Sequence, residues 1–191
     1  MAKLIYGMLT SLDGFVEDEE GRFGWSAPES EQVHSYVNEL TASVGTYLYG
    51  RRMYDTMVYW ETAHEVPNQP QFVLDWANQW QVADKVVYSR TLGEPRSART
   101  TIERDFDPEA IRRLKAESRH DITIDGPELA SLALKAGLVD EIQQTISAVV
   151  VGGGKRFFPA GVKLPLELLE SRAFDKGVVA LRYAVKHGNE R

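Results

Sequence analysis

Short runs rich in β-branched and aromatic residues alternate along this chain with segments of helical periodicity. The pattern predicts strands at residues 3–9, 46–50, 85–89, 100–104 and 121–124, with helical segments between most of them. Such alternation is typical of an α/β domain with a mostly parallel sheet. The last β-rich runs, EIQQTISAVVV, LPLELLES and VVALRYAVKH, have no helix between them. We therefore expect about eight strands in a mixed sheet with an antiparallel carboxy-terminal edge.

The long polar segment from Ser11 to Trp25 is expected to be a loop, and a helix should follow it. Ser26 and Glu29 have the spacing of a capping box, in which the serine accepts from first-turn amides and the glutamate reaches back. The helix should then place one apolar face on the sheet, formed by Val33, Tyr36, Val37 and Leu40.

Three later helices are also predicted. One buries Phe72, Trp76 and Trp80 on a single face, and the next opens with Asp107 as its cap and Pro108 in its first turn. The last follows the turn at Gly126 and should end at Gly137, a residue type that favours the left-handed cap. Its inward residues should be Leu129, Leu132, Ala133 and Ala136.

Composition narrows the functional classes. The 191 residues are 43% hydrophobic, which suits one domain over residues 1–191, and no stretch approaches the roughly 20 apolar residues of a membrane helix. Without cysteine there is no thiolate chemistry, and the four histidines lack paired metal-ligand spacing. A formal net charge of −6 argues against nucleic acid as a partner. We expect a cytoplasmic protein with a small-molecule partner and no metal.

Candidate ligand-binding residues follow two of the predicted strands. Gly50 permits close backbone approach, and Arg51 and Arg52 have guanidinium groups suited to phosphate, although this motif taken alone is better explained by a solvated arginine pair. Ser89 and Arg90 end a later strand and can bind a phosphate dianion in the same way. Because ligands of open α/β sheets sit beyond the carboxyl ends of the strands, these residues are expected to converge.

The turn I-D-G-P-E-L is a third candidate. Gly126 opens a helix whose first amides can hold a pyrophosphate, with Pro127, Glu128 and Leu129 next along the chain. Asp125 would repel a diphosphate unless it points away, and an ordinary helix start with Asp125 as its cap is the alternative.

Taken in order, these motifs resemble the dihydrofolate reductase-like superfamily. The chain is most similar to the branch that contains the carboxy-terminal reductase domain of bifunctional riboflavin biosynthesis proteins, whose reaction is 5-amino-6-(5-phosphoribosylamino)uracil reduction. The resemblance is carried by MLTSLDGFV, YGRRMYD, VYSR, DGPELASLALKAGLVDEI and GGGKRFFP, and it spans almost the whole chain. It implies a three-layer sandwich fold, reductase activity and, commonly, a homodimer.

The resemblance also implies an NADPH site. Gly50, Arg51 and Arg52 would lie near the phosphates, Ser89 and Arg90 near the 2′-phosphate, and Gly126 to Leu129 along the pyrophosphate, with Asp125 also in the cofactor site. The loop from Ser11 to Trp25, with Gly14 in it, would cover the nicotinamide as a lid. The arginines favour NADPH over NADH, because a phosphate dianion requires positive charge.

The motifs leave two candidates for the proton donor. Alignment on the W-x-x-P element of dihydrofolate reductases places Ser30 where those enzymes have an acid, which leaves Asp13 and Glu29 as candidate catalytic carboxylates. Asp13 as a turn residue and Glu29 as part of the capping box are the alternatives. Phe15 stands where the riboflavin branch carries a lysine, which argues against a phosphorylated ribose.

Trp25 and Tyr54 can stack on a flat ring, or belong to the core. The leading hypothesis is therefore an NADPH-dependent reductase of an aminopyrimidine, a pterin or a similar ring. Its rivals are a dinucleotide-binding protein of this fold without turnover, and a homodimeric scaffold without a ligand.

Overall fold

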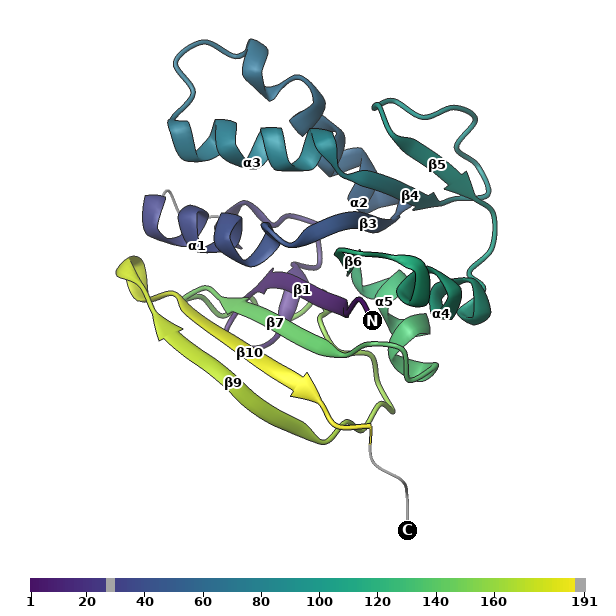
Figure 1. Cartoon of the computed structure of the whole chain (residues 1–191). Coiled ribbons are helices and arrows are strands. Elements are labelled where there is room, and N and C mark those ends of the chain that lie inside the picture. The colour runs from purple at the N-terminus through teal and green to yellow at the C-terminus, as the bar shows by residue number, and fades with distance from the viewer. Residues whose placement is uncertain (27–29, 188–191) are drawn as a thin grey trace.

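The computed structural model describes residues 1–26 and 30–187 and contains an eight-stranded sheet flanked by helices on both faces (Figure 1). In spatial order the strands are β5 (Thr100–Glu103), β4 (Asp84–Tyr88), β3 (Val44–Gly50), β6 (Asp121–Asp125), β1 (Leu4–Thr10), β7 (Glu141–Ile146), β10 (Val179–Val185) and β9 (Leu166–Ala173). All neighbours from β5 to β7 are parallel, whereas β10 is antiparallel to both β7 and β9. This confirms the predicted sheet and its antiparallel edge.

The helices form the outer two layers (Figure 1). The α-helices are α1 (Glu31–Thr41), α2 (Arg51–Met57), α3 (Gln71–Val82), α4 (Pro108–Glu117) and α5 (Pro127–Lys135). On one side of the sheet α1 packs beside α3, and on the other side lie α4 and α5. The arrangement is the three-layer sandwich of the dihydrofolate reductase-like fold.

Alternation along the strands divides the core between the two faces. On β3, Leu48 faces the cluster covered by α4 and α5, whereas Tyr47 and Tyr49 face the cluster that contains Trp76 and Trp80 of α3. Successive side chains of a strand point to opposite faces, so one strand contributes to both cores. The predicted burial of Trp76 and Trp80 is confirmed.

Helix ends follow local rules, with two corrections. Asp107 caps α4 and Gly137, with φ of +65°, follows α5, both as predicted. Ser26 does not cap α1: it lies in a short 3-10 helix and donates to the Phe23 carbonyl, while Ser30 accepts from the Val33 amide and is the true cap. Glu29, the other half of the expected capping box, lies outside the described residues.

The second correction concerns the inward face of α5. Leu129 and Ala133 are buried as expected, but Leu132 is 45% exposed. The helix instead buries Ala130 and Leu134, which together with Leu129 and Ala133 form a stripe at helical spacing.

Part of the expected loop after β1 is ordered as a strand. β2 (Phe15–Glu17) pairs with β8 (Lys155–Arg156) in a second, two-stranded sheet. The approach requires glycine at Gly154, where φ is +120° and a Cβ would lie 2.0 Å from the Glu17 carbonyl oxygen. Next to it, Phe157 is buried and stacks on Tyr6, with ring centroids 4.3 Å apart.

In the described part of the chain no helix has both the length and the apolar character needed to cross a membrane.

Candidate active site

Two adjoining cavities open on the sheet. The larger, which we call the cleft, has a volume of about 770 Å³ and is lined by the residues that follow β3, β4 and β6. The smaller, which we call the pocket, has a volume of about 280 Å³ and lies between α1 and the sheet. Both are lined by Met8, Leu9, Met53, Met57 and Trp60. These shared residues, which we call the junction, make the two cavities neighbours.

Most of the residues predicted to bind a dinucleotide are brought together in the cleft. Gly50 ends β3, Ser89 follows β4 and Gly126 follows β6, so the three candidate motifs meet at the carboxyl edge of the sheet. The residues of this set that line the cleft are Gly50, Arg51, Arg52, Ser89, Arg90, Gly126, Pro127, Glu128 and Leu129.

The predicted arginines of the cleft are paired with carboxylates, of which those of Asp55 and Asp105 are more exposed than that of Glu17. Arg51 donates to Asp55 at 2.8 Å, Arg52 lies 3.5 Å from Glu17, and Arg90 pairs with Asp105. Exposed pairs of this kind contribute only about 0–1 kcal/mol. The guanidinium groups can therefore exchange these partners for a phosphate at little cost.

Two further basic residues line the cleft, Arg104 and Lys155, and neither was predicted as a binding residue. Arg104 donates to the carbonyl oxygens of Ser89 and Leu92, each at 2.8 Å, and so fixes the loop after β4. Lys155 lies 2.9 Å from Glu128 and 3.3 Å from Glu17. Arg104 ends the predicted strand TTIER at the same edge of the sheet as Ser89, which is the signal that identifies it.

The turn before α5 has the backbone geometry of an anion-binding helix start. Gly126 has φ of +99°, which disfavours any residue with a side chain. The helix begins at Pro127, and the first-turn amides of Glu128 and Leu129 have no acceptor within the helix. Because these residues line the cleft, their amides are available to a ligand there.

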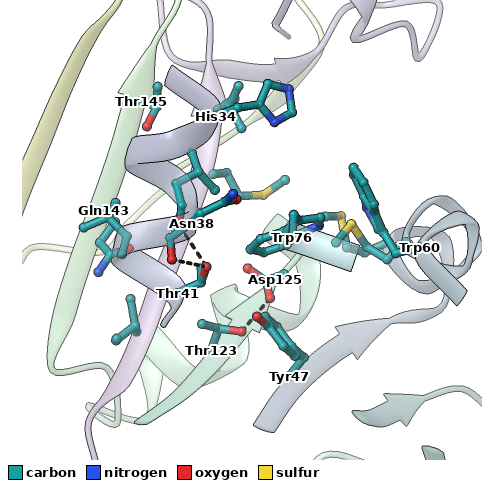
Figure 2. Close-up of a pocket in the computed structure, with 18 of the residues that line it drawn as sticks. His34, Asn38, Thr41, Tyr47, Trp60, Trp76, Thr123, Asp125, Gln143 and Thr145 are labelled. Atoms are coloured by element: carbon teal, nitrogen blue, oxygen red, sulfur yellow. Dashed lines mark hydrogen bonds between the residues drawn. The ribbon is translucent and has the colours of Figure 1, made fainter. Parts of the chain in front are cut away.

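Asp125, which was predicted to belong to the cofactor site, does not line the cleft with the other residues of its turn, and its side chain points away from them. Ile122 and Ile124 of β6 face the core under α4 and α5, so Thr123 and Asp125 face the opposite side and line the pocket. Thr123 Oγ1 donates to Asp125 Oδ2 at 2.8 Å (Figure 2). The alternation of DITID is the sequence signal that places this carboxyl group.

The protonation of Asp125 is set by its surroundings. Although the residue is only partly buried, its carboxyl group is enclosed by protein, and this desolvation raises its pKa to about 7, against the hydrogen bond from Thr123, which lowers it. Among the described residues that line the pocket, none is a lysine or an arginine that would offset the desolvation. The group is therefore present in both protonated and charged forms near neutral pH.

Two other polar atoms of the pocket lack partners. The Tyr47 hydroxyl and Asn38 Oδ1 are buried and make no hydrogen bond, whereas Asn38 Nδ2 donates to the Phe72 carbonyl at 2.8 Å. Burial, reinforced by the charge of Asp125, raises the pKa of Tyr47 well above its usual value, so the hydroxyl stays protonated. Buried polar groups without partners are uncommon in folded proteins. Both atoms have almost no accessible surface, so a ligand would reach them only after neighbouring side chains shift.

The rest of the pocket is apolar and aromatic. Val33, Val37 and Leu40 of α1 line it together with Trp60 and Trp76. Figure 2 shows the two tryptophans across the pocket from His34 and Asn38 of α1. The predicted apolar face of α1 thus packs partly against protein and partly against a cavity on the sheet. Burial also lowers the pKa of His34, which keeps this imidazole neutral at pH 7.

The hairpin that joins β9 and β10 holds α1 over the pocket. Ser30, at the start of α1, donates to Asp175 in the hairpin, and the Tyr36 ring lies 5.0 Å from that of Phe174. Arg172 lies over both rings. The antiparallel edge of the sheet therefore positions a wall of the candidate site.

The remaining sequence candidates lie away from both cavities. Asp13 accepts from the amides of Val151 at 3.2 Å and Gly152 at 2.8 Å, and hydrogen bonds, that from Ser11 first among them, lower its pKa. Gly14 accepts through its carbonyl from the Phe157 amide. Asp13 thus holds the loop after β1 against the loop before β8, and Gly14 holds it against the residue that follows β8. They occupy turn positions and are not among the lining residues.

The two aromatic candidates are also placed outside the cavities. Tyr54 is fully buried, and its hydroxyl lies 2.9 Å from the Ser97 hydroxyl and accepts from the Arg96 amide, so it is a core residue and not a stacking surface. Trp25 donates to the Arg22 carbonyl and lines neither cavity. Trp60 and Trp76 occupy the place expected for aromatic contacts. Within the described residues, no group of three His, Asp or Glu side chains could hold a metal ion.

Comparison with known proteins places this site in a family. YyaP of Bacillus subtilis strain 168, a protein without a characterised function, is 28% identical over 187 residues, which cover 95% of this chain and 94% of YyaP. A protein from Shewanella sp. PV-4 that is assigned to riboflavin biosynthesis superposes with a TM-score of 0.75 at 23% identity, covering 98% of this chain and all of that structure.

A pyrimidine reductase-like protein from Corynebacterium diphtheriae has the same fold. It superposes with a TM-score of 0.71 at 14% identity, covering 98% of this chain and 93% of that structure. The family model of the RibD C-terminal domain matches residues 2–180, which is nearly the entire chain. The chain therefore belongs to the RibD C-terminal domain family, a family of reductase-like domains.

Proposed function

We propose that this protein is an NADPH-dependent reductase that reduces a small heterocyclic ring, an aminopyrimidine or a pterin. One observation carries the proposal: the carboxyl group of Asp125, with a pKa of about 7, faces an apolar pocket that adjoins a cleft lined by arginines. Reduction of a C=N bond adds a hydride to carbon and a proton to nitrogen. The cleft accounts for the first requirement and Asp125 for the second.

The cleft fits a phosphorylated dinucleotide by its donor set. Its described lining contains five basic residues, namely Arg51, Arg52, Arg90, Arg104 and Lys155, against the acidic Glu17, Asp105 and Glu128. Ser89 and Arg90 would hold the 2′-phosphate, and the first-turn amides of α5 would hold the pyrophosphate. NADPH, when bound, supplies the hydride from its nicotinamide ring and leaves as NADP⁺.

Asp125 would deliver the proton. Thr123 donates to Oδ2, which leaves Oδ1 as the oxygen that carries the proton of the neutral acid toward the pocket. Met53, Met57 and Trp60 make the junction between the two cavities apolar, so that a bound ring and cofactor would exclude water from the acid. The charged carboxylate left after transfer regains its proton from solvent at neutral pH.

A binding protein without turnover is the main rival, and it rests on a missing acid and on an aspartate in the pyrophosphate turn. The position of Asp125 supports turnover against this rival, because the side chain lines the pocket and not the cleft, and there it would supply an acid. No observation in the structure favours a scaffold without a ligand.

The cofactor assignment is tested by titrating the protein with NADPH and NADH and following tryptophan fluorescence. Wild-type protein should bind NADPH more tightly than NADH, and Arg90→Glu should weaken NADPH roughly 10- to 100-fold while changing NADH much less, because charge-assisted hydrogen bonds to the 2′-phosphate are lost. Arg112→Glu, an exposed arginine of α4 outside the cleft, is the matched control. Equal weakening of both dinucleotides by Arg90→Glu would remove the 2′-phosphate assignment.

A further inference from the structure

Building on the proposed function, we propose that the ring substrate of this protein is uncharged and carries no phosphate, and that Asn38, Tyr47 and Asp125 recognise its polar edge. The inference separates this chain from a reductase of a phosphoribosyl substrate. It is carried by the charge, the unpartnered polar atoms and the size of the pocket.

The charges of the two cavities differ sharply. The cleft has five basic residues, whereas the described lining of the pocket has none, and Asp125 and His34 are its only groups that ionise near neutral pH. Arg51 and Arg52 lie at the start of α2, and they line the cleft but not the pocket. An anionic substituent placed in the pocket would lose its hydration without gaining a counter-charge, and it would lie near the carboxylate form of Asp125.

The unpartnered atoms beside the pocket match the edge of a neutral nitrogen heterocycle, which would reach them once neighbouring side chains shift, because both atoms have almost no accessible surface. Asn38 Nδ2 donates to the Phe72 carbonyl, and this hydrogen bond leaves Oδ1 as the acceptor for a ring N–H or amino group. The Tyr47 hydroxyl can donate to a ring nitrogen or carbonyl, and it lies on the same side of the pocket as Asp125 (Figure 2). Alternating donors and acceptors of this kind are found on aminopyrimidine and pterin rings.

The size and walls of the pocket suit a ring alone. Its volume of about 280 Å³ lies at the lower end of the ~300–1,000 Å³ typical of ligand sites. Trp60 and Trp76 lie at right angles, with ring centroids 6.0 Å apart, and Val37 and Leu40 complete the wall. A flat ring can fill this space by stacking, whereas a ribose phosphate would require further volume and a basic side chain.

The inference is tested by isothermal titration calorimetry with pterin and 6-carboxypterin, which differ by one carboxylate. The measurements use the full chain without a dinucleotide, at moderate ionic strength and pH 7.5. Pterin should bind at least tenfold more tightly than 6-carboxypterin. A second measurement uses Val37→Lys, which adds a cation to the pocket wall and should improve 6-carboxypterin binding at least fivefold relative to pterin. Leu40→Lys provides the same charge from the next turn if the first variant does not fold.

The outcomes separate this inference from the proposed function. Equal or tighter binding of 6-carboxypterin by the wild-type protein, or no binding of pterin at millimolar concentration, would overturn the inference. So would a failure of both lysine variants to shift the preference while they retain wild-type NADPH affinity. Loss of the proposed function would instead appear as absent NADPH binding in the separate dinucleotide titration, whichever ring is preferred.

Discussion

Asp125 combines a structural cost with a chemical role. Its carboxyl group ends β6 among tyrosine, tryptophan and aliphatic side chains, where the charged form loses hydration, and Thr123 is the one described side chain that donates to it. The same side chain also raises the pKa values of Tyr6 and Tyr49, although their own burial is the larger cause. A single acid in this environment can supply a proton at neutral pH, which an exposed aspartate cannot.

Replacing this acid should separate turnover from cofactor binding. Asp125→Asn should lower kcat with a ring substrate about 10²- to 10⁴-fold, because the amide cannot deliver a proton to the ring nitrogen. The dissociation constant of NADPH should stay within about twofold, since Asp125 does not line the cleft. Asp75→Asn, an exposed position on α3, is the matched control and should be silent. Retention of wild-type kcat in Asp125→Asn would exclude this residue as the donor.

The raised pKa of Asp125 also predicts a pH-dependent stability. Between the ordinary aspartate pKa of about 4 and the folded value of about 7, the folded state holds a proton that the unfolded state has lost, so the free energy of unfolding falls as the pH rises. Relative to wild type, Asp125→Asn should therefore be more stable at pH 8 than at pH 5, by roughly 2–3 kcal/mol. Urea unfolding of both proteins at the two pH values measures this difference. A difference that does not change with pH would contradict the raised pKa.

Among the elements, the small β2–β8 sheet fixes one rim of the cleft. It places Glu17 and Lys155 within 3.3 Å of each other, and Lys155 in turn reaches Glu128 of α5. The predicted lid from Ser11 to Trp25 is thus tied down at Phe15–Glu17 in this structure. The approach of the two short strands depends on the absence of a side chain at Gly154.

Gly154→Ala should therefore unfold or displace this rim. The new Cβ meets the Glu17 carbonyl in addition to the left-handed backbone strain, so we expect a loss of about 3 kcal/mol or more in the free energy of unfolding. Gly152→Ala is the matched control, because Gly152 also has positive φ, +81°, but open space around its Cβ. That variant should lose only about 1–2 kcal/mol. Thermal or urea unfolding compares the two, and equal losses would show that the close approach contributes nothing.

Much of the element order was accessible from the sequence, because strand alternation and helix caps are local signals. KVVYS and DITI became β4 and β6, and Asp107 capped its helix as predicted. The β2–β8 pair was missed, since strands of three and two residues carry no periodicity. Ser26 has the stronger local signal, because Glu29 follows it at capping-box spacing while Val33 follows Ser30, and the contact of Ser30 with Asp175 is distant in sequence.

Only part of the site was predicted from the sequence, again because local signals are visible there and contacts distant in sequence are not. Gly50, Ser89 and Gly126 end successive strands, so their convergence follows from a parallel sheet. The walls of the pocket come from α1, α2, α3 and four strands, and no local pattern reveals that Asn38, Tyr47 and Gln143 share one cavity. Asp125 lies between these cases. Its strand was predicted from the sequence, but the side of the sheet on which its carboxyl group lies follows only when the alternation along β6 is compared with the position of the core.

At the scale of the whole molecule, the arrangement of the helices on the sheet explains why the cleft and the pocket adjoin. The sheet separates a core under α4 and α5 from a face on which α1 and α3 leave the pocket, and the cleft runs along the carboxyl ends of the same strands. Met8 and Leu9 of β1 lie at the junction, next to both. A dinucleotide in the cleft and a ring in the pocket would therefore meet at the centre of the sheet edge.

A crystal structure of the NADPH complex tests this arrangement. The account predicts the adenosine 2′-phosphate beside Ser89 and Arg90, the pyrophosphate at Gly126–Leu129, and the nicotinamide at the junction, with the pocket and Asp125 left open on its far side. A dinucleotide whose nicotinamide lies away from Met53 and Trp60, or whose adenosine fills the pocket, would contradict it.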